Sequence, residues 1–460
     1  MSDGKLAMLR DAANAALAAG DNAEALTALT ELLPHDRQTS VLLNIGVCHY
    51  RLGDAKTAMQ FLEDAHNSDP TDAKVIGNAA VISSESGAPR FFDKTVLSPQ
   101  TWNEVGLNLY FHGDFDGARD ALERAIALKP DYFTAYHNIC DLIDDADSAL
   151  WLAKARRLSP TADEDVAAVQ YMMAHLHDKR GEFELAAKAM LKGGAHRRLT
   201  FDPVFSAEGH RKLTQSFIDT FDRAAIEKLR APSGGADMIF IVGMPRSGST
   251  LTARVLSAEP DVADLGEMRT FPQALIDELE RLGGGERAPL TALTADSMQR
   301  IADAYLAVTP GEACVRIDKY LENSLFLGIL HAALPDAKIV ETRRDPYDTM
   351  LSCLSKNFTM GNGWSYRPED IRAYYDDYVA VMDHWRRSLP ANAIYVSDHD
   401  RLTADPETVV AELSAHCGVQ ASANLKSGGQ VKTASAMQVR DGIKRRKTSR
   451  YEGYKPFITF

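Results

Sequence analysis

A short pattern that occurs four times in the first half of the chain constrains the fold most strongly. Each copy has a glycine and, five positions further on, an alanine; the pairs are Gly20 and Ala25, Gly53 and Ala58, Gly113 and Ala118, and Gly181 and Ala186. Glycine permits a tight turn, and alanine lets two helices pack closely. In two copies a proline that would end the next helix follows the glycine by 17 residues, at Pro70 and Pro130. The pattern predicts a series of helix–turn–helix units.

The pattern resembles the tetratricopeptide repeat, a helix–turn–helix unit of about 34 residues. Gly20 and Gly53 are 33 residues apart, but Gly53 and Gly113 are 60 apart, so we expect a degenerate or bent unit over residues 73–92. A further irregular helix pair is expected over residues 131–160.

The chain is predicted to have two domains joined by a helical linker. Residues 1–198 form an α-helical, tetratricopeptide-like solenoid, residues 199–235 the linker, and residues 236–460 an α/β domain with a central parallel sheet and a P-loop-like start. Repeats of this kind stack with a concave face. That face is either a groove for a peptide or protein partner, or a structural or dimerising surface.

Short β-branched runs alternate with helical patterns in the α/β domain. The runs are "MIFIVG" (238–243), "ACVRID" (313–318), "AKIVET" (337–342) and "AIYVS" (393–397). This alternation is typical of a parallel, doubly wound sheet. Ligands of such sheets bind beyond the carboxyl ends of the strands, so we expect the site at that edge.

A phosphate-binding loop is predicted in "IVGMPRSGST", residues 241–250. Gly243 and Gly248 have the spacing of the nucleotide-triphosphate P-loop, but Ser249 stands where that motif has lysine. Backbone N–H groups at a helix start bind an anion without lysine, so the loop suits a ligand with fewer clustered phosphates than ATP. The alternative is a plain glycine-rich turn. The candidate binding residues are Arg246, Ser247, Gly248, Ser249 and Thr250.

Two further motifs are basic. "RRDP" (residues 343–346) follows a strand, where Arg344 can bind an anion with Ser352 and Lys356 in reach; otherwise it is a salt-bridged turn. In the tail, five of the seven residues from 444 to 450 are basic and lie among apolar residues. This favours docking over a solvated tail.

Taken together, five motifs resemble the sulfotransferases, and most of all the protein-tyrosine sulfotransferase branch, which includes bacterial members fused to tetratricopeptide repeats. The motifs are "MPRSGST", "GEMRTFP", "DKYLEN", "KIVETRRDPYDTMLS" and "TASAMQV…SRY". The spacings of 21 residues from Arg246 to Glu267, 25 from Lys319 to Arg344, and 15 from Ser435 to Arg450 match that branch.

The resemblance implies 3′-phosphoadenosine 5′-phosphosulfate as the donor, with no metal ion. Its 5′-phosphosulfate would lie in the loop of residues 246–250. Its 3′-phosphate would contact Arg344 and Ser352, with Lys356 where the family has an arginine. His399 stands where the branch has an adenine-side tyrosine, so the nucleotide contact is altered there.

The resemblance also implies catalytic roles. Glu267 would be the base that takes the proton of the acceptor hydroxyl. Lys319 and Ser435 would stabilise charge on the leaving phosphate, and Arg246 would hold the phosphosulfate. Arg450 would assist nucleotide binding from the tail.

Composition excludes several other classes. The net charge of −13 argues against general binding of nucleic acid or anionic membranes. Five scattered cysteines without C-x-x-C spacing, and the lack of a signal sequence or an apolar span, favour a cytoplasmic protein, with a homodimer as one option. Two other function classes stay open: a magnesium-dependent kinase or nucleotidase, and an inactive nucleotide-binding scaffold with a partner-binding repeat surface.

The sequence leaves the identity of the acceptor hydroxyl open. A tyrosine in a peptide or protein, a sugar hydroxyl and a small phenol all fit, and the repeats favour the peptide. Residues 357–370, "NFTMGNGWSYRPED", are expected to line the acceptor mouth.

Overall fold

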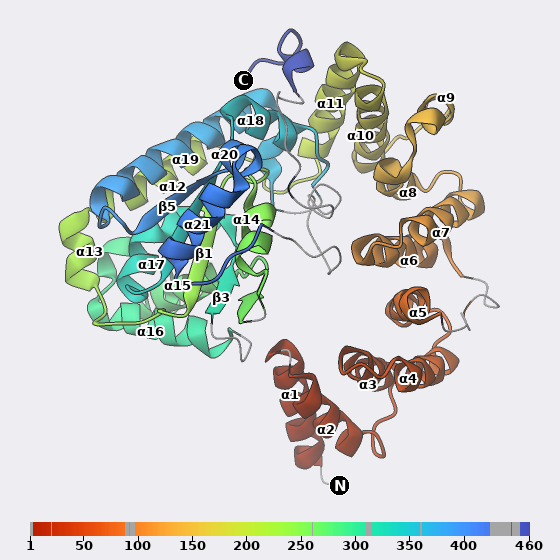
Figure 1. Ribbon diagram of the computed structural model, residues 1–460, viewed down its shortest axis with the longest axis horizontal. Helices are drawn as coiled ribbons and strands as arrows, with labels where there is room; N and C mark the ends of the chain where they lie inside the picture. Colours follow the sequence, from red (N-terminus) through yellow and green to blue (C-terminus); the bar gives the residue numbers. More distant parts are fainter. Residues whose placement is uncertain are drawn as a thin grey trace. The chain divides into compact units, whose positions relative to one another are not determined.

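The computed structural model describes residues 3–19, 21–87, 92, 97–259, 261–309, 315–358, 361–423, 443 and 451–460 (Figure 1). The chain divides into two compact units. The first, here called the repeat unit, runs to Glu182, and the second, the sheet unit, begins at Phe183. The domain boundaries predicted at residues 198 and 235 stay predictions.

The repeat unit is built from antiparallel helix pairs, as the glycine–alanine pattern predicts. Three pairs are regular: α1 (Asp3–Ala19) with α2 (Asn22–Leu32), α3 (Thr39–Arg51) with α4 (Ala55–Ser68), and α6 (Pro99–His112) with α7 (Phe115–Leu128).

The turn in these pairs is a glycine followed by an aspartate. Gly53 and Gly113 have left-handed φ values of 89° and 92°. The aspartate that follows each glycine is the N-cap of the next helix: Asp54 accepts from the amide of Thr57, and Asp114 accepts from that of Gly117. Glycine alone adopts such φ values at little cost, which explains the spacing of the pattern.

The irregular units are confirmed in the expected places. Residues 73–92 contain one long helix, α5 (Ala73–Ser86), among the described residues. Residues 131–160 contain the short helices α8 (Phe133–Asn138) and α9 (Ser148–Ala155), joined by two 3-10 turns. Helix α10 (Asp163–Lys179) follows.

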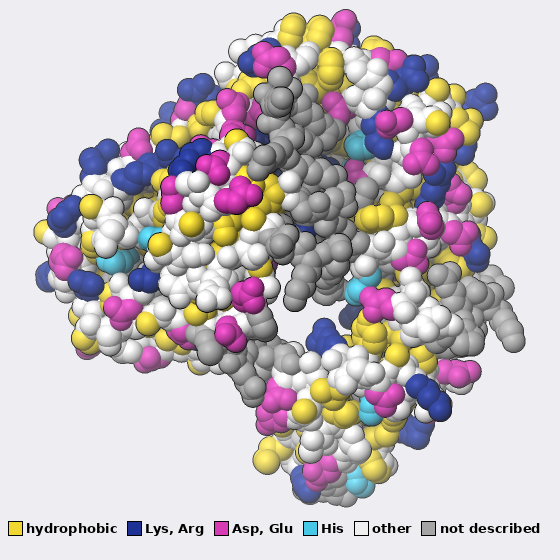
Figure 2. Space-filling view, in the orientation of Figure 1, with side chains coloured by type: hydrophobic (Ala, Val, Ile, Leu, Met, Phe, Trp, Pro, Cys, Tyr) yellow, Lys and Arg dark blue, Asp and Glu magenta, His cyan; other side chains and the backbone are white. Residues whose placement is uncertain are grey.

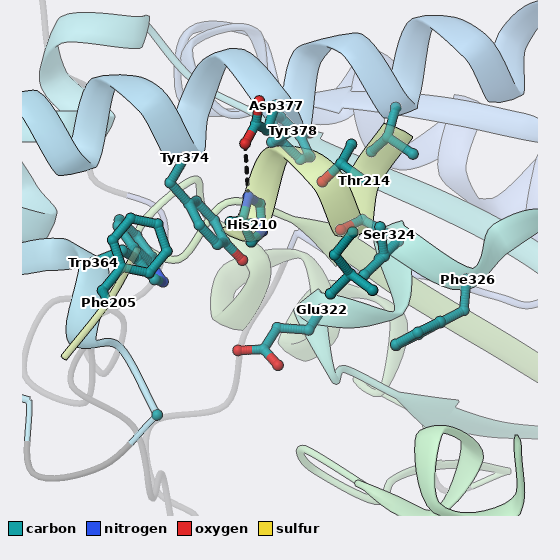
Figure 3. Close-up of a pocket in the computed structure, with 14 residues that line it drawn as sticks. Phe205, His210, Thr214, Glu322, Ser324, Phe326, Trp364, Tyr374, Asp377 and Tyr378 are labelled. Carbon is teal, nitrogen blue, oxygen red and sulfur yellow. Dashed lines mark hydrogen bonds and ion pairs between the residues drawn. The ribbon is translucent and has the colours of Figure 1, made fainter. Parts of the chain in front are cut away.

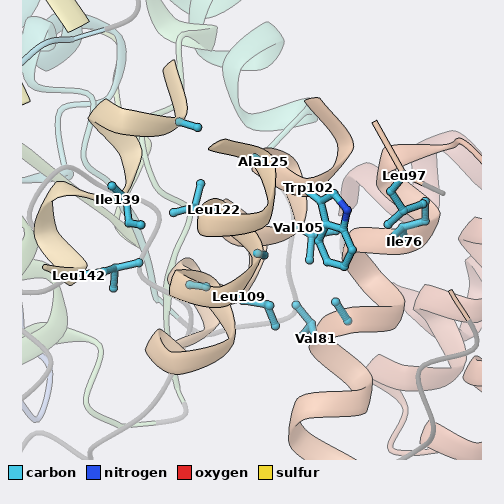
Figure 4. Packing of buried hydrophobic residues seen from close by; sticks show 14 of the residues in the cluster. Ile76, Val81, Leu97, Trp102, Val105, Leu109, Leu122, Ala125, Ile139 and Leu142 are labelled. Atoms are coloured by element: carbon cyan, nitrogen blue, oxygen red, sulfur yellow. The ribbon is translucent and has the colours of Figure 1, made fainter. Parts of the chain in front are cut away.

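One apolar core runs through the helices from α3 to α10 (Figure 4). Small residues let helix backbones approach in this core: a Cβ added to Gly106, which faces Ala118 of the pattern, would lie 2.7 Å from Cγ of Leu122 and 3.2 Å from the carbonyl oxygen of Ala118. Burial of such side chains is the main stabilising term of a solenoid.

The sheet unit contains five parallel strands in the order β2-β3-β1-β4-β5. Their bounds are β1 (Met238–Gly243), β2 (Val262–Asp264), β3 (Val315–Asp318), β4 (Lys338–Arg343) and β5 (Ile394–Asp398). All six residues of the central strand β1 are buried, which explains its uninterrupted apolar sequence. The predicted parallel sheet is confirmed; the short edge strand β2 was not predicted.

Helices cover both faces of the sheet, as right-handed crossovers require (Figure 1). Helix α14 (Ser249–Leu256) contacts α21 (Pro406–Cys417), while α16 (Ala295–Ala307), α17 (Leu327–Ala333) and α19 (Pro368–Ser388) form another contacting set. The other helices of this unit are α11 (Phe183–Arg198), α12 (Ala207–Thr220), α13 (Arg223–Leu229), α15 (Thr270–Leu282), α18 (Pro346–Leu354) and α20 (His399–Ala404).

Within the described residues, no helix combines the length and apolar character needed to cross a membrane. On the face shown in Figure 2, Lys and Arg side chains are interspersed with Asp and Glu side chains. An anion site on this molecule must therefore be built from a few local groups.

Candidate functional site

The loop between β1 and α14 has the backbone of an anion cradle. Gly243 has φ 145°, and a Cβ there would lie 2.6 Å from the carbonyl oxygen of Thr342. Gly248 has φ 106°, and its Cβ would lie 2.7 Å from Nδ1 of His399. Both positions require glycine because a side chain would be strained and would clash with neighbouring strand ends.

The same loop ends at a helix start that has no side-chain cap. Gly248 is the N-cap residue of α14 and has no side chain that could cap the first turn of this helix. Such amides carry the positive end of the helix dipole and bind anions. The backbone of the loop therefore fits a phosphate or sulfate group.

The side chain of Ser247 and the backbone of Arg246 define the shape of the loop. The hydroxyl of Ser247 donates to the carbonyl oxygen of Met244 at 2.6 Å and lies 2.7 Å from Oγ1 of Thr342 on β4. Arg246 has φ 70°, the one left-handed φ among the described non-glycine residues. Such strain costs about 1–3 kcal/mol and is typical of functional sites. The side chain of Ser247 thus holds the loop in place.

A second cluster follows β4 and joins the first through Ser352. Nε of Arg246 donates to Oγ of Ser352 at 3.0 Å, and the hydroxyl of Tyr451 lies 3.3 Å from the same oxygen. The guanidinium of Arg344 lies 5.6 Å from the centre of the Tyr451 ring and pairs with Asp348 at 2.9 Å.

Arg344 retains one unused donor in this cluster. Its side chain is 12% exposed, and its buried Nε has no hydrogen-bond partner among the described residues. A buried donor without a partner costs free energy unless a ligand supplies an acceptor. This atom, together with the glycine cradle, fits a nucleotide with two separate anionic groups.

Cys353 closes the back of the loop. Its thiol donates to the carbonyl oxygen of Pro245 at 3.3 Å, and burial raises its pKa to about 12, although Arg246 and Arg344 act in the opposite direction. The thiol is therefore neutral and structural.

The third cluster follows β3 and pairs two of the candidate catalytic residues. Nζ of Lys319 lies 3.3 Å from Oε1 of Glu267, and the Lys319 amide donates to the carbonyl oxygen of Gly266 at 2.7 Å. The Lys319 side chain is 3% exposed, whereas that of Glu267 is 56% exposed. A buried cation beside an accessible carboxylate lets an incoming hydroxyl reach the carboxylate.

Asp318 ties the two segments of this pair together. Its carboxylate accepts from the amides of Tyr320 at 2.9 Å and Met268 at 3.4 Å, and from the Tyr305 hydroxyl at 2.9 Å. Burial raises the pKa of Asp318 to about 6, while these hydrogen bonds limit the rise. Asp318 and Tyr305 were not predicted as site residues; the aspartate before Lys319 at a strand end was the available signal.

The sheet register brings these clusters to one edge. Asp318 pairs with Phe240 of β1, Thr342 with Gly243, and Arg343 with Asp398. The residues that follow each strand, including Lys319, Arg344 and His399, are thus neighbours along the carboxyl edge. Thr342, whose hydroxyl contacts the loop, was also missed.

The structure gives fewer contacts for the remaining predicted site residues. The His399 ring lies against Gly248, so it contacts the loop. Lys356 is partly buried in the segment after α18. Ser435 and Arg450 lie outside the described residues, so their roles stay predictions.

An aromatic pocket of about 280 Å³ lies in the sheet unit between α12, α19 and residues 322–326. Figure 3 shows Phe205, Trp364 and Tyr374 on one side of it and Phe326 on the other, with Glu322 between them. Trp364 and Gly361, which lines the pocket too, belong to the segment expected to line an acceptor mouth.

Each of the two units contains a region that matches a known protein family. Residues 237–423 match the model of the sulfotransferase family, and residues 10–73 match a tetratricopeptide-repeat model. A protein of Aquifex aeolicus (strain VF5), described as uncharacterized, is 26% identical over 365 residues, which make up 75% of this chain and 47% of that protein. The chain therefore spans about half the length of this relative.

Two solved structures are similar at low identity. The sulfotransferase domain of the Synechococcus PCC 7002 olefin synthase is 18% identical, with a TM-score of 0.35 and coverage of 50% of this chain and 91% of that one. A sulfotransferase from Alicyclobacillus acidocaldarius is 19% identical, with a TM-score of 0.28 and coverage of 44% and 87%. On the two family matches, the chain combines a tetratricopeptide-repeat region with a sulfotransferase-family domain.

Proposed function

We propose that the sheet unit transfers a sulfuryl group from 3′-phosphoadenosine 5′-phosphosulfate to an acceptor hydroxyl. One observation supports this above the others: the two candidate anion-binding clusters, after β1 and after β4, lie along the same edge of the sheet as the lysine–glutamate pair. A nucleoside triphosphate has its phosphates in one chain, whereas this donor carries a 5′-phosphosulfate and a distant 3′-phosphate.

The proposed contacts follow from the geometry of the loop and of Arg344. The amides of Ser249 and Thr250 and the guanidinium of Arg246 would hold the 5′-phosphosulfate. Arg344 would bind the 3′-phosphate through its unused Nε, with the hydroxyl of Ser352 next to it. Lys356, His399 and Arg450 remain proposed nucleotide contacts.

The proposed reaction is an in-line displacement with balanced proton and bond changes. The acceptor oxygen forms a bond to sulfur, and the bond between sulfur and the bridging oxygen of the 5′-phosphate breaks. Glu267 takes the acceptor proton, and Lys319 and Ser435 stabilise the negative charge left on the phosphate. The products are a sulfate ester and adenosine 3′,5′-bisphosphate.

The acceptor hydroxyl is proposed to be phenolic, because the aromatic pocket next to the pair is ring-lined. A tyrosine in a peptide is one such acceptor, and the repeat unit would then bind the protein that carries it.

Transfer of labelled sulfate from the donor to phenolic acceptors, with excess chelator in place of magnesium, tests the proposal. We expect product from the wild-type protein, and a loss of about 100-fold or more in kcat for Glu267→Gln with little change in donor affinity. Glu259→Gln, at an exposed carboxylate of the same unit, is the matched control. Transfer that requires magnesium, or that survives in Glu267→Gln, would show the assignment to be wrong.

A further inference from the structure

The aromatic pocket adjoins a second cavity whose lining is mostly apolar. This cavity, here called the apolar groove, has a volume of about 550 Å³ and lies between α12, α15 and residues 287–291. Leu213 and Phe326 line both the pocket and the groove, so the two spaces meet at these side chains. The groove is walled by Phe217, Leu275, Ile276, Leu279 and Pro289.

Two contacts link the aromatic pocket to residues close to the candidate catalytic pair. Glu322, which lines the pocket, accepts from the hydroxyl of Tyr320, the residue after Lys319. The guanidinium of Arg269, two residues after Glu267, lies 6.0 Å from the Tyr320 ring centre and also lies against Gly361 of the pocket. Residues next to the catalytic pair and residues of the groove therefore both border the pocket.

Two buried polar atoms in the lining of the pocket have no hydrogen-bond partner in the described part of the chain. Thr214 and Trp364 are each 3% exposed, and Oγ1 and Nε1 of these two residues have no hydrogen-bond partner among the described residues. Buried polar atoms at a cavity wall are costly unless a bound molecule or water meets them. The protein therefore leaves this space for an occupant and does not fill it with its own side chains.

A sugar would be a poor occupant. Tyr374 is stacked on Trp364 at 4.1 Å between ring centres, and His210 lies against it at 4.5 Å, so neighbouring rings cover the faces on which a sugar would stack. Several polar groups of the lining are already engaged, since His210 pairs with Asp377 and the Tyr378 hydroxyl donates to Glu341. A single aromatic ring fits the volume and the lining of the pocket better.

The apolar lining of the groove favours a small-molecule acceptor over a peptide. With a phenolic hydroxyl at Glu267 and Lys319, the opposite position of the ring points past Leu213 and Phe326 into the groove. In a tyrosine residue that position leads to the peptide backbone, whose polar groups lose hydrogen bonds in an apolar space. A hydrocarbon tail gains free energy there.

We propose that the acceptor is an amphiphilic phenol whose ring lies in the aromatic pocket and whose hydrocarbon tail lies in the apolar groove. This proposal rests on the proposed function, since it names the acceptor of the same transfer. The tail supplies binding free energy at a distance from the reacting oxygen.

A series of 4-alkylphenols from methyl to octyl tests the proposal directly. Binding is measured by calorimetry with the full chain saturated with adenosine 3′,5′-bisphosphate, and KM by sulfate transfer. Each added methylene is expected to strengthen binding and lower KM by about fourfold until the groove is filled. Affinities that do not change with tail length would overturn the proposal.

Variants on one helix locate the tail. Ile276 lines the groove from α15, and its neighbour Asp277 is exposed. We expect Ile276→Gln to reduce the gain per methylene strongly and Asp277→Gln to leave it unchanged. Leu213→Gln, at a side chain that is 48% exposed, gives the same test if the first variant folds poorly. An unchanged gain in both groove variants would place the tail elsewhere and contradict the proposal.

The same measurements separate this inference from the proposed function. Transfer to tyrosine peptides or sugars without any tail effect on phenols would leave the sulfotransferase assignment standing and refute the amphiphilic acceptor. Absence of both nucleotide binding and transfer to every acceptor would refute the assignment itself, and the inference with it.

Discussion

At the scale of single residues, the site depends on how a few polar atoms are shared. The hydroxyl oxygen of Ser352 accepts hydrogen bonds from Arg246 and Tyr451. The Asp318 carboxylate accepts hydrogen bonds from Tyr305, Tyr320 and Met268. Each of these acceptors fixes the position of a residue that would touch the substrate. Ser352 is therefore both a proposed contact of the 3′-phosphate and the residue that positions Arg246, whereas Asp318 acts on position alone.

Arg344→Ala is expected to weaken donor binding more than turnover. The variant removes a charge-assisted contact worth about 1.5–3 kcal/mol, so the affinity for adenosine 3′,5′-bisphosphate should fall by roughly 10- to 100-fold. Calorimetry of nucleotide binding measures the change. Arg401→Ala, which removes an exposed ion pair with Glu412, is the control and should bind normally. Unchanged affinity in Arg344→Ala would mean that the 3′-phosphate lies elsewhere.

Asp318→Asn is expected to change the pH dependence of stability. Burial raises the pKa of Asp318 to about 6 from an ordinary value of 3.8, so the unfolded state binds fewer protons between these values and the wild-type protein loses stability as the pH rises from about 4 to 6. The neutral amide has no such titration. From pH 4 to 6, the free energy of unfolding of the variant should therefore rise relative to that of the wild type by up to about 3 kcal/mol.

Urea unfolding at several pH values, followed for the sheet unit, measures this difference. Asp303→Asn, at an exposed carboxylate of α16, is the control. A difference that stays constant from pH 4 to 7 would show that Asp318 does not titrate in this range.

At the scale of elements, the sequence predicted those parts that have a local physical cause. The four longer strands are apolar runs, and the glycine–aspartate turns set both the left-handed φ and the cap of the next helix. Strand β2 has three residues at the sheet edge and ends in an aspartate, so no apolar run marks it. Its position follows from pairing with β3.

The candidate site was predicted only where spacing within one segment was sufficient. Arg246 and Ser249 belong to a recognisable loop, whereas Glu267 and Lys319 were assigned through resemblance, since a lone carboxylate or lysine is usually a surface residue. The contact of Asp318 with Tyr305 and that of Ser247 with Thr342 join separate elements. Such contacts depend on the register of the sheet, which cannot be predicted from a local sequence pattern.

Gly248→Ala is expected to abolish nucleotide binding. The new Cβ would have a left-handed φ of 106° and would lie 2.7 Å from His399, so the loop must move. Gly418→Ala is the matched control, because Gly418 has φ 70° at the end of α21 but nothing within 4 Å of the added Cβ. It should lose about 1 kcal/mol of stability and keep its affinity. Equal affinities in the two variants would contradict the role of the loop.

At the scale of the whole molecule, two compact units carry separate cores. The repeat core is a stack of alanine- and leucine-rich helices, and the sheet core surrounds the buried strand β1. Short-range contacts dominate a solenoid, so each of its units depends chiefly on its neighbours. The partner of the repeat unit and the oligomeric state of the chain remain predictions.

Gly106→Ala is expected to destabilise the repeat unit and leave nucleotide binding intact. The added Cβ would lie 2.7 Å from Leu122, and such overpacking costs about 1–3 kcal/mol, partly offset by the higher helix propensity of alanine. Calorimetric scans should show one transition shifted to lower temperature, while adenosine 3′,5′-bisphosphate still stabilises another. Gly4→Ala, which places no atom within 4 Å of the new Cβ, is the control. Loss of nucleotide binding in Gly106→Ala would show that the units are energetically coupled.

The buried thiol behind the loop gives the molecule an internal reporter. Cys353 donates to the carbonyl oxygen of Pro245, and a thiol that burial keeps neutral reacts slowly with alkylating reagents. Reagent can reach this sulfur only when the segment around Pro245 lifts away from α18. The rate at which the Cys353 thiol is alkylated therefore measures how often the loop of residues 244–248 opens, and no added label is needed.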